Sequence, residues 1–137
     1  MSLSQPFPFY GRYVREIVLT TAGGMLIKQN ESTLLVPSYI SPFMTALPPS
    51  DEDEVLFYDE LAKGGIFFVQ WNKHFGSDDR VDMLKMQMHL YMDGSVRFLY
   101  QRLGPNAVSF IKDKGFSLAI GLMDGFAAAV QDKPDGK

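Results

Sequence analysis

Histidines and carboxylates are the first residues to consider for catalysis or metal binding, and this chain has only two histidines. His74 precedes three aspartates at positions 78, 79 and 82, and imidazole with carboxylates can bind a divalent cation. The spacing lacks the Asp-x-Asp-x-Asp-Gly pattern of a calcium loop, so we expect no metal site there. His89 falls on the more polar side of an alternating segment, which predicts a solvated or hydrogen-bonded imidazole.

The sequence contains no motif for nucleophilic catalysis or for cofactor binding. It has no cysteine, which excludes a Cys nucleophile, a disulfide framework, Cys-ligated zinc and an iron–sulfur cluster. It also lacks a nucleophile elbow, a P-loop and a dinucleotide fingerprint. The acidic run at residues 51–54 is typical of a solvated loop. We therefore expect a protein that is not an enzyme and that needs no cofactor.

Several large apolar residues present a choice between ligand binding and core packing. Trp71, the only tryptophan, would suit sugar stacking if it were exposed. It follows Phe67 and Val69 at period two, however, which predicts a buried position. The same rule predicts a core position for three methionines: Met86, Met88 and Met92. We expect the aromatic cluster near the N-terminus to close one end of the domain: Phe7, Phe9 and Tyr10.

The clearest local structure is a hairpin around Asp93-Gly94. A two-residue loop there would put Leu90 opposite Arg97, and the apolar faces of the two strands would disagree. A three-residue loop at 92–94 puts Leu90 opposite Val96 and gives Gly94 the left-handed position that such a bulged turn needs. We predict the three-residue loop, which also pairs Tyr91 with Ser95, Met88 with Phe98 and Met86 with Tyr100.

Short apolar runs separated by Gly, Pro, Asn and Asp recur about every ten residues, which favours an all-β fold. We predict a two-sheet β-sandwich, largely antiparallel, with few or no helices. The strand candidates lie at residues 13–20, 25–28, 33–36, 66–71 and 117–122, and residues 107–111 fit a strand or one helical turn. Residues 53–63 fit either a helix, from the acids at 51–53 to a cap at Gly64, or a strand and turn.

The composition fits one domain. We expect residues 1–130 to form one module and residues 131–137, which hold no apolar side chain, a flexible tail. A net charge of -3 argues against a nucleic-acid partner, and no apolar run reaches the length of a membrane helix. Asn30-Glu31-Ser32 is a possible N-glycosylation site at Asn30.

Six short segments occur in a characteristic order between residues 6 and 127. They are Phe-Pro-Phe-Tyr-Gly at 7–11, Thr-Ala-Gly-Gly at 21–24, Tyr-Ile-Ser-Pro-Phe-Met at 39–44, Phe-Val-Gln-Trp at 68–71, Met-Asp-Gly at 92–94 and Ile-Gly-Leu-Met-Asp-Gly-Phe at 120–126. In this order they resemble the nidogen-like extracellular domain of the plexin-domain-containing protein family. The resemblance favours a strand over a helix at residues 54–58.

The resemblance implies a disulfide-free ectodomain module of a single-pass cell-surface glycoprotein, on the extracellular side of the plasma membrane. A Cys-rich module and a membrane span would lie outside this sequence. The implied function is adhesion or reception through an extracellular-matrix or secreted protein ligand. The alternative is a carbohydrate-binding β-sandwich. Loops at residues 48–54 and 73–80 are the expected contact regions, because loops on a rigid scaffold commonly carry recognition. The oligomeric state stays open.

Overall fold

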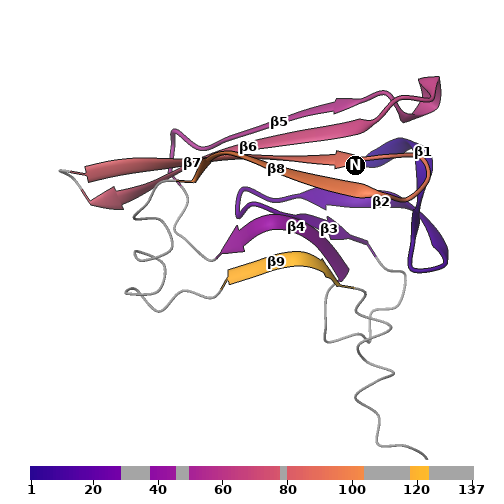
Figure 1. Ribbon diagram of the computed structural model, residues 1–137, viewed down its shortest axis with the longest axis horizontal. Coiled ribbons are helices and arrows are strands. Elements are labelled where there is room, and N and C mark those ends of the chain that lie inside the picture. The colour runs from indigo at the N-terminus through magenta and orange to yellow at the C-terminus, as the bar shows by residue number, and fades with distance from the viewer. Residues whose placement is uncertain (29–37, 46–49, 78–79, 104–117, 124–137) are drawn as a thin grey trace, which may run out of the picture.

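Alternating apolar residues give this chain strands with one buried face, and the computed structural model confirms a sandwich of two antiparallel sheets (Figure 1). It describes residues 1–28, 38–45, 50–77, 80–103 and 118–123. Figure 1 shows the sheets stacked, with β5 at the top of the view and β9 at the bottom. No helix in these described ranges is long and apolar enough to cross a membrane.

One sheet has five strands in the order β1-β2-β3-β4-β9. Its strands are β1 (Ser2–Phe9), β2 (Arg12–Leu19), β3 (Met25–Ile27), β4 (Ser38–Thr45) and β9 (Leu118–Met123). The other sheet is a four-stranded meander of β5 (Glu54–Asp59), β6 (Phe67–Ser77), β7 (Arg80–Leu90) and β8 (Val96–Leu103). Because β9 pairs with β4, the last described strand returns to the sheet of the first four.

The longest pairing joins β6 to β7. It runs without a break from Phe67 opposite Leu90 to Ser77 opposite Arg80. The predicted loop at residues 73–80 is therefore wrong for most of its length. The two strands continue to pair there, and only residues 78–79 lie between them.

The hairpin between β7 and β8 has the predicted three-residue loop. The Tyr91 N–H donates to the Ser95 carbonyl at 3.0 Å, and Leu90 lies opposite Val96. Gly94 has a φ of 89°, in the left-handed region that favours glycine. The pairs Met88–Phe98 and Met86–Tyr100 are also as predicted. Matching of the apolar faces was thus sufficient to fix the register.

Residues 53–63 form a strand and a turn rather than a helix. β5 pairs with β6 over its whole length, from Glu54 opposite Asn72 to Asp59 opposite Phe67. The capping signal belongs to a single 3-10 turn, η1 (Leu61–Lys63), which ends at Gly64 with a φ of 76°. Pairing with a long neighbouring strand therefore outweighed the local helix signals.

The core lies between the sheets, and Trp71 is fully buried in it as predicted. Its indole Nε1 donates to the Thr20 carbonyl at 2.7 Å, which links β6 to the end of β2. Met86 and Met88 are also buried. The prediction for Met92 is wrong: this side chain is 45% exposed, because it lies in the hairpin loop beyond the end of β7.

The N-terminal aromatic cluster divides between core and solvent. Phe7 and Phe9 on β1 are buried as expected, whereas Tyr10 is 57% exposed, so its predicted packing role is wrong. Tyr10 adopts a positive φ of 47° in the β1–β2 turn. Several other predicted features lie outside the described residues: Asn30, the strand candidates at 33–36 and 107–111, and the tail at 131–137.

Gly23 lies in the turn between β2 and β3, and a substitution there tests how closely this turn packs against β4. A Cβ at Gly23, where φ is 100°, would lie 2.1 Å from the Phe43 carbonyl oxygen, whereas a Cβ at Gly64 would meet nothing within 4 Å. We expect Gly23→Ala to lower the free energy of unfolding by about 3 kcal/mol or more, and Gly64→Ala by about 1 kcal/mol from backbone strain alone. Urea denaturation followed by Trp71 fluorescence measures both. Equal losses would contradict the close approach of Gly23 to Phe43.

Candidate interaction surface

The four-stranded sheet has an outer face that points away from the core. On β6 and β7 it consists of the side chains that alternate with the buried ones, and on β5 and β8 of the residues that pair with them; we call it the outer face. Cross-strand pairing arranges it in three rows. The rows are Tyr58–Phe68–His89–Arg97, Leu56–Gln70–Gln87–Leu99 and Glu54–Asn72–Lys85–Arg102.

A chain of hydrogen bonds crosses the outer face from β7 to β5. His89 Nε2 and Gln87 Oε1 lie 3.3 Å apart, and Gln87 Nε2 donates to Gln70 Oε1 at 2.9 Å. Gln70 Nε2 donates to Asn72 Oδ1 at 3.2 Å. Asn72 Nδ2 then donates to Glu54 Oε2 at 3.1 Å. Each amide holds the next, so these polar groups have defined orientations before any partner arrives.

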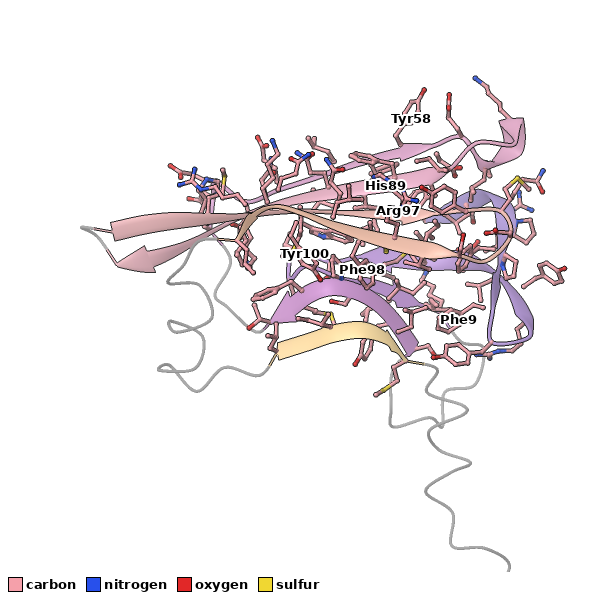
Figure 2. The ribbon with its side chains drawn as sticks, viewed as in Figure 1. Phe9, Tyr58, His89, Arg97, Phe98 and Tyr100 are labelled. Carbon is pink, nitrogen blue, oxygen red and sulfur yellow. The ribbon has the colours of Figure 1, made fainter. Side chains whose placement is uncertain are left out.

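Aromatic side chains lie beside this series of hydrogen bonds. Phe68 and His89 have ring centroids 5.3 Å apart, and Arg97 lies 5.7 Å from the centre of the Tyr91 ring. Tyr58 on β5 is 58% exposed, and Figure 2 shows it pointing away from the opposite sheet. Its hydroxyl donates to Glu60 Oε1 at 2.7 Å, and this bond raises the pKa of Tyr58. The first row therefore offers aromatic rings and one cation, Arg97, to a partner.

His89 is one of the outward-facing residues of this surface. Burial lowers the pKa of His89, and the nearby Arg97 guanidinium lowers it further. The imidazole is therefore neutral at pH 7 and takes part in the outer face as a hydrogen-bonding group. This is the hydrogen-bonded role predicted for it from the alternation of β7.

Parts of the two segments predicted to carry recognition lie next to each other at one end of the sheet. Asp53, just before β5, accepts the His74 N–H at 2.7 Å through Oδ1. Its Oδ2 accepts the Ser50 N–H and the Lys73 ammonium, both at 2.9 Å. Glu52 Oε2 lies 3.8 Å from His74 Nε2. The acidic turn is therefore attached to β6 through Asp53 and is more than a solvated loop.

Lys73 and Asp53 form a buried ion pair, with side-chain exposures of 2% and 4%. Lys73 is the next inward-facing residue of β6 after Trp71, so a charged side chain occupies a buried position on this strand. Burial raises the pKa of Asp53, but the hydrogen bonds from His74, Ser50 and Lys73 and the charge of Lys73 together hold it below its usual value. The Asp53 carboxylate is therefore charged at neutral pH.

The acidic candidates near His74 do not form a site in the described part of the chain. Residues 78 and 79 lie outside the description, and Asp82 pairs through its backbone with Phe75, whereas His74 pairs with Met83. Among the described residues, no group of three or more His, Asp or Glu side chains is placed to hold a metal ion. The cluster at this end is thus an ion pair with an adjoining imidazole.

The sequence reasoning missed the outer face, although the signal was present. Gln70 and Asn72 alternate with the buried Val69, Trp71 and Lys73, just as Gln87 and His89 alternate with buried methionines. The predicted contact regions were instead the loops at residues 48–54 and 73–80, because loops on a rigid scaffold commonly carry recognition. No protein-family model matches the sequence, and a search of the solved structures finds no match.

The Lys73–Asp53 pair is open to a mutational test. Asp53→Asn leaves a buried ammonium without a counter-charge, so we expect a loss of about 3–5 kcal/mol in the free energy of unfolding. The double variant Asp53→Asn/Lys73→Met removes both charges and should recover most of that loss. The exposed Asp51→Asn is the matched control and should change stability by less than about 0.5 kcal/mol. A double variant as unstable as Asp53→Asn would contradict the pair.

The same pair predicts a dependence of stability on pH. Because the pKa of Asp53 is lower in the folded state than in the unfolded chain, its contribution is complete above the unfolded value of about 3.9. It is lost as the pH falls through the folded pKa. The difference in unfolding free energy between the wild type and Asp53→Asn should therefore be constant from pH 7 to 5 and shrink below pH 4. A difference that is unchanged at pH 3 would contradict this assignment.

Proposed function

We propose that this domain is a non-catalytic extracellular protein-interaction module, an adhesion or receptor ectodomain that binds a matrix or secreted protein ligand through its outer face. The module stands on the extracellular side of the plasma membrane and is tethered by a span outside this sequence. The resemblance of the six ordered motifs to nidogen-like domains supports the extracellular setting. The absence of cysteine agrees with that setting, because the nidogen-like modules that this sequence resembles are also free of disulfides.

The observation that carries the proposal is the combination of exposed anchors and ordered polar groups on one sheet face. Tyr58 and Arg97 are exposed at opposite edges of the same row, and both residue types are enriched among the residues that dominate protein interfaces. Between them, Gln70 and Gln87 hold each other in place. A partner would therefore meet a surface that needs little ordering, which lowers the entropic cost of binding.

This proposal is tested with immobilised matrix proteins, such as collagens, laminins and fibronectin. We expect the domain to bind at least one of them and Tyr58→Ala to weaken that binding about 10-fold or more, since it removes an anchor from the outer face. Tyr13→Ala is the matched control, because Tyr13 is 80% exposed on β2 of the other sheet. Equal effects of the two substitutions, or none from Tyr58→Ala, would overturn the assignment of the surface.

A carbohydrate-binding module is the second candidate, and the amide chain favours it. Side chains of Gln70, Gln87 and Asn72 offer the planar donors and acceptors that sugar hydroxyls require, and Phe68 and Tyr58 lie beside them as stacking surfaces. Saturable binding on a glycan array that free sugar competes away, and that Gln87→Ala removes, would support this candidate. A blank array would eliminate it.

A further inference from the structure

Charge is segregated across the outer face. β5 has two acidic residues and no basic one, and Glu54 is its outward-facing acid. β8 has two arginines, Arg97 and Arg102, and no acidic residue. Lys85 on β7 lies opposite Arg102 in the third row. In a chain with a net charge of -3, this face therefore has an acidic edge along β5 and a basic edge along β8.

Such a face is self-complementary under one particular symmetry. If a second copy is placed on it by a two-fold axis parallel to the strands, β5 of each copy lies over β8 of the other. An axis perpendicular to the strands would instead put each strand over its own copy and exchange the two end rows, so Arg97 would lie over Arg102 with like charges in contact. Isologous dimers require this kind of self-complementary patch. Charge therefore selects the first arrangement and rejects the second.

The rows also match under this operation. Glu54 of one copy lies over Arg102 of the other, which pairs opposite charges. Leu56, which is half exposed, lies over Leu99, and Tyr58 lies over Arg97, an arrangement suited to a cation–π contact. Every row thus gains a favourable pairing at both of its ends.

The centre of the face is compatible with the same arrangement. Gln70 lies over Gln87 of the second copy, and an amide can donate and accept at once. Sheets that pack face to face tolerate a crossing angle of about 30°, which is small enough to keep acidic and basic edges in register.

We propose that the outer face binds a second copy of this chain, face to face, about a two-fold axis parallel to the strands. This inference rests on the proposed function because it names a partner for the same surface, and it makes the adhesive contact homophilic. Self-association then competes with any matrix ligand for the face.

The size of the face sets the strength of this contact. Four strands about 4.8 Å apart and seven residues at about 3.4 Å each give roughly 20 Å by 24 Å, or about 500 Å² per copy. Stable interfaces bury about 800 Å² per partner, so the dimer is a weak, reversible one. Such contacts need high local concentration, which a membrane surface provides.

Sedimentation velocity of the intact domain, from micromolar to about 1 mM, tests the proposal. We expect a monomer–dimer equilibrium that weakens in 1 M salt, because screening removes the attraction between the edges. Glu54→Arg or Arg102→Glu alone should each weaken dimerisation about 10-fold or more, since the dimer contains each contact twice. The double variant Glu54→Arg/Arg102→Glu exchanges the charges and should return to within about threefold of the wild type.

Several outcomes would overturn the proposal. A wild-type chain that stays monomeric at all concentrations, or that dimerises equally well in 1 M salt, contradicts it without any variant. So does a double variant as weak as the single ones, or loss of dimerisation by Tyr13→Ala on the other sheet.

Binding of the wild type and the same variants to immobilised matrix proteins distinguishes the homophilic contact from the proposed function. Retained matrix binding by a strictly monomeric domain would reject the homophilic contact and leave the proposed function standing. Dimerisation through the outer face with no matrix binding would support the homophilic contact and remove the matrix ligand.

Discussion

Alternation along β6 and β7 is the constraint on which the rest of the structure depends. These strands pair over eleven residues each, and their inward side chains from Phe67 to Lys73 and from Leu84 to Leu90 are buried. A shift of one residue would turn every buried side chain outward, so the pairing has a single acceptable register. The same constraint determines what the outer face can be, because Phe68, Gln70, Gln87 and His89 are the residues that the core leaves out. Core and candidate surface are therefore two consequences of one pattern.

Lys73 is the exception that shows how firmly the pattern is held. It occupies an inward position after Trp71, where burial of an unpaired ammonium would be costly. The turn before β5 supplies Asp53, and three donors converge on that carboxylate. The charged residue thus attaches the acidic turn to the sheet and sets the start of β5, the acidic edge of the outer face.

The sequence was informative where periodicity and packing agree. Burial of Trp71, the bulged hairpin at Gly94 and the two-sheet architecture all follow from alternation and from turn geometry. The sequence was less informative about where each strand ends. Met92 continues the alternation but lies beyond the last pair of β7, and residues 73–77 resemble a polar loop although they pair as strand. The outer face required knowledge of which strands are neighbours, since Glu54 and Arg102 become opposite edges of one row only in the folded sheet.

Self-association through the outer face is tested most directly by a series of ¹⁵N–¹H correlation spectra of the domain at increasing concentration. We expect concentration-dependent shifts that cluster on β5–β8 at outward positions such as Tyr58, Gln70, Gln87 and Arg97. Amides of β1–β4 and β9 should stay in place. Shifts centred on the five-stranded sheet, or spectra that do not change with concentration, would contradict it.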